Sequence, residues 1–239
     1  MADPAGSGIR ERKKVRTREA LVEAATELCL RQGFDNTTVE QIATAADVST
    51  RTFSRYFANK GAVVAAIADE MDVHIATALS RQPAELTEYE ALLAAHLAVF
   101  APDTGRLTPG FQRMAALIAI VNGSHSAKAS AFAHQRGISQ NAAMTVMGRR
   151  MGVAFDHPAV RLISDMWTML FATSFSGLGL PGNDPIEPKV VCDRLCATFE
   201  VFRRSWSPWN DPEHDPEHVA GDEEDNGLQH RQPPASAPG

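Results

Sequence analysis

Apolar side chains recur at helical spacing along most of the chain. In the first such segment Leu21, Ala25 and Leu28 share one face of a helix, and Gly33 follows as a typical helix-ending residue. Proline, glycine and Asn-Gly breakers separate further segments with the same period, and no alternating strand pattern appears between them. The sequence therefore predicts an all-α fold. About nine helices are expected, at residues 17–32, 39–46, 50–57, 59–81, 84–100, 109–121, 124–151, 157–178 and 186–206.

Residues 37–60, TTVEQIATAADVSTRTFSRYFANK, combine two short helices with a tight turn between them. A capping box at the start of the first helix fits Thr38 with Gln41 and equally Thr37 with Glu40, and the sequence leaves this choice open. Such a pair of helices is typical of a helix-turn-helix, whose second helix enters the DNA major groove. The alternative, two ordinary core helices, does not account for the threonine, arginine and lysine side chains at the outward positions.

The outward side chains of this segment are candidates for DNA contacts. Arginine can donate two hydrogen bonds to a guanine edge, and threonine can bond a base edge or touch the thymine methyl group. Hydroxyl and ammonium groups can bond backbone phosphates. Phe53 and Phe57 are expected to face the core instead. The candidate base readers or their neighbours are Thr50, Arg51, Thr52, Ser54 and Arg55, and the candidate phosphate anchors are Thr38, Tyr56 and Lys60.

The segment resembles the DNA-binding domain of TetR-family transcriptional regulators. The matching positions are Thr38, Ile42, Ala43, Ala46, Val48, Ser49, Phe53, Tyr56, Phe57 and Lys60. The sequence departs from the family pattern where Asp47 replaces a glycine in the turn, Ser54 an aromatic residue and Gly61 an acidic residue. The resemblance implies a helical domain that binds an effector and forms a homodimer through the last two helices. It also implies a palindromic DNA operator as the partner.

The helices beyond residue 61 are apolar enough to form a second core. Residues 157–178 are apolar on most faces, and such a helix needs partners on several sides. Methionine and aromatic side chains also make adaptable apolar cavities. The alternatives are the core of a monomer in place of a dimer interface and ordinary packing in place of a cavity. The candidate effector-binding residues are Met114, Leu117, Phe132, Met144, Met147, Met151, Trp167 and Phe171.

One histidine and two cysteines of this region could contact a ligand or form a disulfide. For His96, a satisfied position at the surface or in the core is expected rather than contact with a ligand. Cys192 and Cys196 lie four residues apart on one predicted helix. A disulfide with that spacing would be strained, so two free thiols are expected.

Charge is distributed unevenly along the chain. The net charge is −6, but residues 208–239 hold eight acids and one arginine, which leaves 22 basic and 21 acidic residues elsewhere. Residues 10–18 are rich in arginine and lysine, where a nucleic-acid reader needs them. The predicted organisation is a flexible basic arm at 1–14, a helix-turn-helix DNA-binding domain at 15–60, a helical effector-binding and dimerisation domain at 61–207, and a disordered, acidic, Pro-rich tail at 208–239.

Composition and missing motifs exclude several classes of protein. Three cysteines without metal-ligand spacing favour a reducing cytoplasm, and no apolar run approaches the length of a membrane helix. Phosphate-loop, serine-hydrolase and zinc-protease motifs are absent, so we expect no enzyme, no cofactor and no metal. The predicted function is a ligand-responsive transcriptional regulator, a repressor released from its operator by a small, largely apolar effector. The alternative is an effector-blind DNA-binding dimer or scaffold protein.

Overall fold

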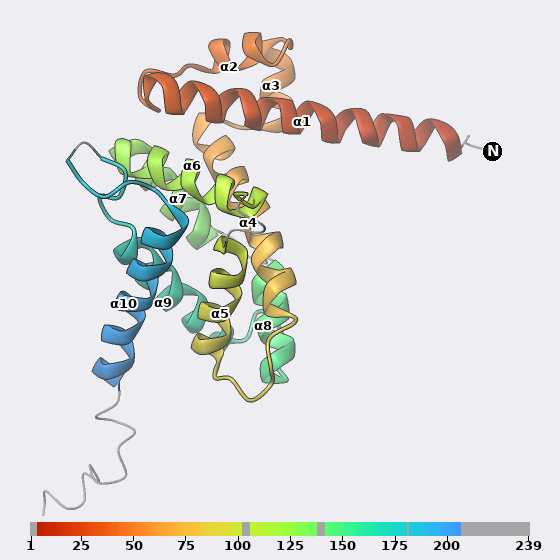
Figure 1. Cartoon of the computed structure of the whole chain (residues 1–239). Helices are drawn as coiled ribbons and strands as arrows, with labels where there is room; N and C mark the ends of the chain where they lie inside the picture. The colour runs from red at the N-terminus through yellow and green to blue at the C-terminus, as the bar shows by residue number, and fades with distance from the viewer. Residues whose placement is uncertain (1–3, 102–105, 138–141, 181, 207–239) are drawn as a thin grey trace, which may run out of the picture. The chain divides into compact units, whose positions relative to one another are not determined.

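The structure, a computed structural model, describes residues 4–101, 106–137, 142–180 and 182–206 (Figure 1). Ten α-helices and no strands occupy these residues, which confirms the all-α prediction. None of these helices is long and apolar enough to cross a membrane. The predicted tail at 208–239 lies outside the described residues. The helices are α1 Pro4–Gln32, α2 Val39–Ala45, α3 Thr50–Tyr56, α4 Lys60–Leu79, α5 Glu88–Phe100, α6 Pro109–Gly123, α7 His125–Gly137, α8 Ala142–Met151, α9 Pro158–Ser174 and α10 Pro188–Trp206.

The first helix begins earlier than predicted. α1 starts at Pro4 rather than near Thr17, so the described part of the predicted flexible arm is helical. The segment between them lacks a breaker after Gly8, and its arginine, lysine and glutamate residues favour helix. The Thr17 hydroxyl donates to the Lys13 carbonyl at 2.9 Å inside the same helix.

An apolar core joins α1, α2, α3 and the first half of α4. Phe53 of α3 is 1% exposed, and Ile42 of α2 and Leu21 of α1 are fully buried. Val63 and Ile67 complete this core from α4. The three-helix domain therefore does not close on itself, because the fourth helix supplies one of its walls.

The second half of α4 lies in a different environment. Met71, Ile75 and Leu79 are buried against the helices of the body, since α4 contacts α5, α6, α7 and α8. One helix thus contributes to both cores. The described residues up to Phe199 pack as one compact unit. The predicted domain boundary after Lys60 falls within α4, and it stays a prediction.

One predicted helix is wrong. Residues 124–151 form two helices, α7 and α8, which makes ten helices instead of about nine. α7 ends at Gly137, a poor helix former, and α8 begins at Ala142. The Asp72 carboxylate of α4 accepts hydrogen bonds from the backbone N–H groups of Ala142 and Ala143, at 2.8 and 3.3 Å. The new helix start is thus satisfied by a partner 70 residues away, which helical periodicity cannot reveal.

Lys60 fastens the start of α4 to the loop that follows α1. Its ammonium donates to the carbonyl oxygens of Phe34 at 2.7 Å, Thr37 at 3.0 Å and Asp35 at 3.3 Å. The same nitrogen lies 4.4 Å from the centre of the Phe34 ring. An ammonium group has three N–H donors, so these carbonyls use its full capacity. Lys60 therefore holds α2 and α4 in register through the loop between α1 and α2.

Replacing Lys60 by methionine keeps the aliphatic stem and removes these donors. Because hydrogen bonds from a charged group are worth more than neutral ones, Lys60→Met should lower the free energy of unfolding by about 2 kcal/mol. Urea denaturation measures the change, with Lys13→Met, an exposed position on α1, as the matched control. Unchanged stability together with a weaker salt dependence of DNA binding would instead favour the phosphate contact suggested by the sequence.

Candidate nucleic-acid interface and effector cavity

The start of α2 resolves which threonine caps it. The Thr38 hydroxyl accepts from the Gln41 N–H at 3.2 Å, and the Gln41 side chain accepts from the Thr38 N–H at 3.0 Å. Thr37 is buried instead, and its hydroxyl donates to the Gly33 carbonyl at 2.8 Å. The capping box is therefore Thr38 with Gln41. The Thr38 side chain stays exposed, so a phosphate could still approach it.

The turn between α2 and α3 depends on Asp47. In the described part of the chain, Asp47 alone among non-glycine residues has a positive φ, of 53°. Aspartate tolerates this left-handed conformation better than most residues with a Cβ atom. Its N–H donates to the Thr44 carbonyl at 3.1 Å, and the Val48 N–H donates to the Ala43 carbonyl at 2.9 Å. Asp47 thus adopts the left-handed turn conformation for which the TetR-family pattern has a glycine at this position.

The recognition helix α3 has one buried face and one exposed face. Phe53 and Phe57 are 1% and 5% exposed, and their rings lie 5.8 Å apart. Ser49 caps the helix by accepting from the Thr52 N–H at 3.1 Å. These anchors fix the rotation of a helix that is only seven residues long. The side chains left exposed are those of Thr50, Arg51, Ser54 and Arg55, with Thr52 and Tyr56 half-buried.

The exposed residues of α3 differ in how free they are to bind DNA. The Arg55 guanidinium lies 5.3 Å from the centre of the Tyr56 ring, which orients both side chains together. The Ser54 hydroxyl donates to the Thr50 carbonyl at 3.0 Å, so its proton is used within the helix. The Thr52 hydroxyl is 3.0 Å from that of Ser49. Arginine offers the bidentate geometry that guanine recognition needs, so Arg51 is the strongest candidate base reader.

α1 places further basic charge beside the recognition helix. The Arg18 guanidinium lies 5.4 Å from the centre of the Phe57 ring, directly after α3. Upstream on the same helix the side chains of Arg12, Lys13, Lys14 and Arg16 are exposed. The positive charge is therefore carried on a regular helix that contacts the residue following α3, and it can attract a phosphate backbone.

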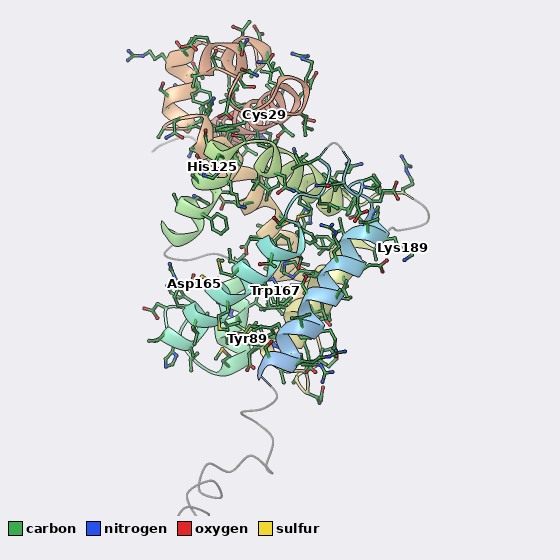
Figure 2. All side chains as sticks on the ribbon, turned by 90° about the vertical axis from the view of Figure 1, so that its left-hand side faces the viewer. Cys29, Tyr89, His125, Asp165, Trp167 and Lys189 are labelled. Atoms are coloured by element: carbon green, nitrogen blue, oxygen red, sulfur yellow. The ribbon has the colours of Figure 1, made fainter. Side chains whose placement is uncertain are left out.

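The body contains a partly open cavity of about 230 Å³. Helices α4 to α9 line it, and its walls are mostly apolar. Figure 2 shows Trp167 within the body, on α9. Seven of the eight predicted residues line the cavity; Met151, the last residue of α8, does not, because the helix ends one turn beyond Met147. The predicted residues that do line it are Met114, Leu117, Phe132, Met144, Met147, Trp167 and Phe171.

His96 is a wall residue that sequence reasoning did not assign to the cavity. Burial lowers the pKa of His96 to about 4, so the ring is neutral near pH 7. Its Nδ1 donates to the Leu92 carbonyl at 2.7 Å, and its Nε2 accepts from the Trp167 indole N–H at 3.3 Å. Both nitrogens are thus satisfied, as the sequence suggested, so neither is left as an unpartnered polar atom in the cavity wall.

The cavity also has a polar side that the sequence did not reveal. Asp69 and Asp72 of α4, Asn122 of α6 and Lys128 of α7 contribute to the lining. Burial raises the pKa of Asp72, and the nearby Asp69 charge acts in the same direction. His134 of α7 contacts Asp69, with Nε2 2.8 Å from the carboxylate. These residues come from separate helices, so no sequence spacing marked them as neighbours.

The N-terminal segment matches known regulators. Residues 21–67 match the family model described as "Bacterial regulatory proteins, tetR family". The chain is 42% identical over 107 residues to the HTH-type transcriptional regulator TcmR of Streptomyces glaucescens, which is 45% of this chain and 46% of that protein. It is 40% identical over 67 residues to YdeS, an uncharacterized HTH-type transcriptional regulator of Bacillus subtilis strain 168, covering 28% of this chain and 31% of that one. The chain thus matches less than half the length of these relatives.

A solved structure resembles the chain over more of its length. It is a crystal structure of Thermus thermophilus FadR, a TetR-family transcriptional repressor, in complex with lauroyl-CoA. The TM-score is 0.48 and the identity 20%, over 92% of this chain and 100% of that chain. The segment matched by the family model runs from α1 into α4 and includes the whole helix-turn-helix. In this domain, residues 21–67, the chain matches the TetR family of bacterial regulatory proteins.

Proposed function

We propose that the protein is a homodimeric transcriptional regulator that binds a palindromic operator and releases it when a small, largely apolar effector enters the body. It acts as a repressor in the cytoplasm, by binding rather than by catalysis. The observation that carries this proposal is α3, whose polar residues are exposed while Phe53 and Phe57 anchor its other face. A helix held in this way can be docked as a rigid unit into a major groove.

The dimer is supported by an apolar face on α9. Leu162 and Met169, seven residues apart and therefore on one face, are 59% and 58% exposed. On the neighbouring α10, Cys196 and Ala197 are exposed, and Trp167 of α9 lies 6.4 Å from Phe199 of α10 between ring centres. Exposed apolar residues on adjacent helices fit a self-complementary interface. Two recognition helices would then read two half-sites, which gives far more specificity than one short helix.

The effector site is supported by the cavity. Its apolar walls and its size suit a compact, largely apolar molecule. The effector acts by binding one of two states more tightly, since equal affinity for both would shift nothing. α4 lines the cavity and begins at the DNA-binding domain, so it connects the effector site directly to the helix-turn-helix. The second candidate is a DNA-binding dimer that responds to no effector. It is less well supported, because such a protein has no need of an apolar cavity.

Removing Arg51 tests base recognition. Because a bidentate contact to guanine is lost, Arg51→Ala should weaken operator binding by about 1–3 kcal/mol and relax the preference at one base position. Operator DNA selected from a random library, followed by titration of single-base variants, measures both effects. Arg81→Ala, an exposed position directly after α4, is the control. Unchanged affinity and unchanged preference would remove Arg51 from the set of base readers.

A charge placed on α9 tests the dimer. Met169→Asp puts a carboxylate at the centre of the proposed apolar interface, where it would be desolvated without a partner. We expect this variant to sediment as a monomer at concentrations where the wild type is a dimer. Val73→Asp, an equally exposed apolar position on α4, should remain dimeric. If Met169→Asp still sediments as a dimer, the interface does not include this face of α9.

Filling the cavity tests the effector site. Ala131 of α7 lines the cavity, whereas Ala133 on the same helix is exposed. A neutral aromatic probe, 1-naphthol, should raise the melting temperature of the wild type because it binds only the folded protein. Ala131→Phe should abolish that increase and Ala133→Phe should leave it intact. An equal increase in both variants would place the probe outside the cavity.

A further inference from the structure

Helix α7 touches the cavity and the DNA-binding domain at the same time. Lys128, Ala131 and Phe132 line the cavity, while Ala127 is fully buried in the N-terminal core. Figure 2 labels His125 at the start of α7, below the N-terminal helices, among which α1 holds Cys29. Two further contacts on the outer side of this helix join it to the residues around Lys60. α7 therefore spans the distance between the two proposed sites within a few turns.

The first contact is the close approach of Gly61 to Ser130. A Cβ atom at Gly61 would lie 2.6 Å from the Ser130 Oγ and 2.9 Å from the Ser130 Cβ. Distances this short force one of the helices to move. Glycine is a weak residue inside a helix, so its use here is explained by the approach of α7 to α4 rather than by helix stability. Gly61 directly follows Lys60, whose ammonium fastens the loop after α1.

The second contact joins α7 to that same loop. The Ser126 hydroxyl donates to the Asp35 carboxylate at 2.7 Å, and hydrogen bonds from Ser126 and Ser124 lower the pKa of Asp35. The Ser130 hydroxyl donates to the Ser126 carbonyl at 2.9 Å, one turn away on α7. Asp35 in turn offers its backbone carbonyl to Lys60 at 3.3 Å. Both contacts of α7 therefore converge on the residues that position α2 and α3.

We propose that α7 transmits the occupancy of the cavity to the helix-turn-helix, with Gly61 and Ser130 as the positioning residues and Asp35–Ser126 as the second link. This regulation rests on the proposed function of the cavity and of the dimer. An occupant that presses on Ala131 and Phe132 displaces α7. Since the approach of Ser130 to Gly61 leaves no free space, the displacement passes to the start of α4 and so to the spacing of the two recognition helices.

The experiment uses the full-length protein and operator DNA selected from a random library with the wild type. Affinities are measured for the selected operator, for operators whose half-site spacing is changed by one base pair, and for a single half-site. Gly61→Ala should weaken binding to the selected operator by about tenfold or more and shift the preferred spacing. Its affinity for the single half-site should stay within about threefold of wild type. A purely structural defect would weaken binding to all these DNAs alike.

Complementary substitutions separate contact from general damage. Ser130→Gly removes the atoms that an alanine at position 61 would meet, so the double variant should recover the wild-type affinity and spacing to within about threefold. Gly123→Ala is the control, because a Cβ atom there has nothing within 4 Å. No recovery in the double variant, or an equal loss on every DNA, overturns the positioning role.

A separate substitution tests whether α7 responds to occupancy of the cavity. Ala131→Phe fills the cavity from α7 and should weaken operator binding in the manner of Gly61→Ala, whereas Ala133→Phe should not. If Ala131→Phe abolishes 1-naphthol binding and leaves operator affinity and spacing unchanged, α7 does not transmit occupancy. A wild type that selects no DNA would contradict the proposed function itself, and a wild type that selects a lone half-site would contradict the proposed dimer. Either result is distinct from a failure of this inference.

Discussion

The fold depends on α4 being shared by two cores. Val63 and Ile67 close the apolar core of the DNA-binding domain, and Met71, Ile75 and Leu79 continue into the body along the same helix. Removing α4 from either core would expose fully buried side chains, each worth about 1.5–3 kcal/mol of transfer free energy. α4 is therefore part of both cores, and a displacement of this helix would affect both. The same helix lines the cavity, so the proposed effector site and the DNA-binding domain share one structural element.

The energetics of the cavity set a condition on the mechanism. A molecule that buries roughly 200 Å² of apolar surface gains about 5 kcal/mol before the cost of immobilisation. Reversing a two-state equilibrium from 1:99 to 99:1 requires about 5.5 kcal/mol of differential binding. The first quantity is smaller than the second even before that cost, so a compact effector shifts the equilibrium strongly only if nearly all its binding energy is lost in the DNA-bound state. The proposed mechanism thus requires the cavity to be largely closed when the protein holds its operator.

Local features of the site could be predicted from the sequence, and those with distant partners could not. The inward position of Phe53 and Phe57 follows from spacing within one short helix, and the turn at Asp47 follows from residue chemistry. Lys60 stays a candidate phosphate anchor, but its carbonyl partners lie 23 to 26 residues away in the chain, where spacing gives no sign of them. The same holds for His96, whose partner Trp167 follows it by 71 residues. Spacing patterns carry no information about such pairs.

The strengths of the contacts differ in a way that suits a switch. Inside the DNA-binding domain, buried aromatic rings and the three carbonyl bonds of Lys60 hold α1, α2, α3 and the start of α4 together. The link from this domain to α7 includes a hydrogen bond between exposed groups, Ser126 to Asp35, which is worth far less. A disturbance of α7 would therefore break or shift the outer link before it distorts the recognition helix. The domain would keep its ability to read a half-site while losing the alignment that two half-sites demand.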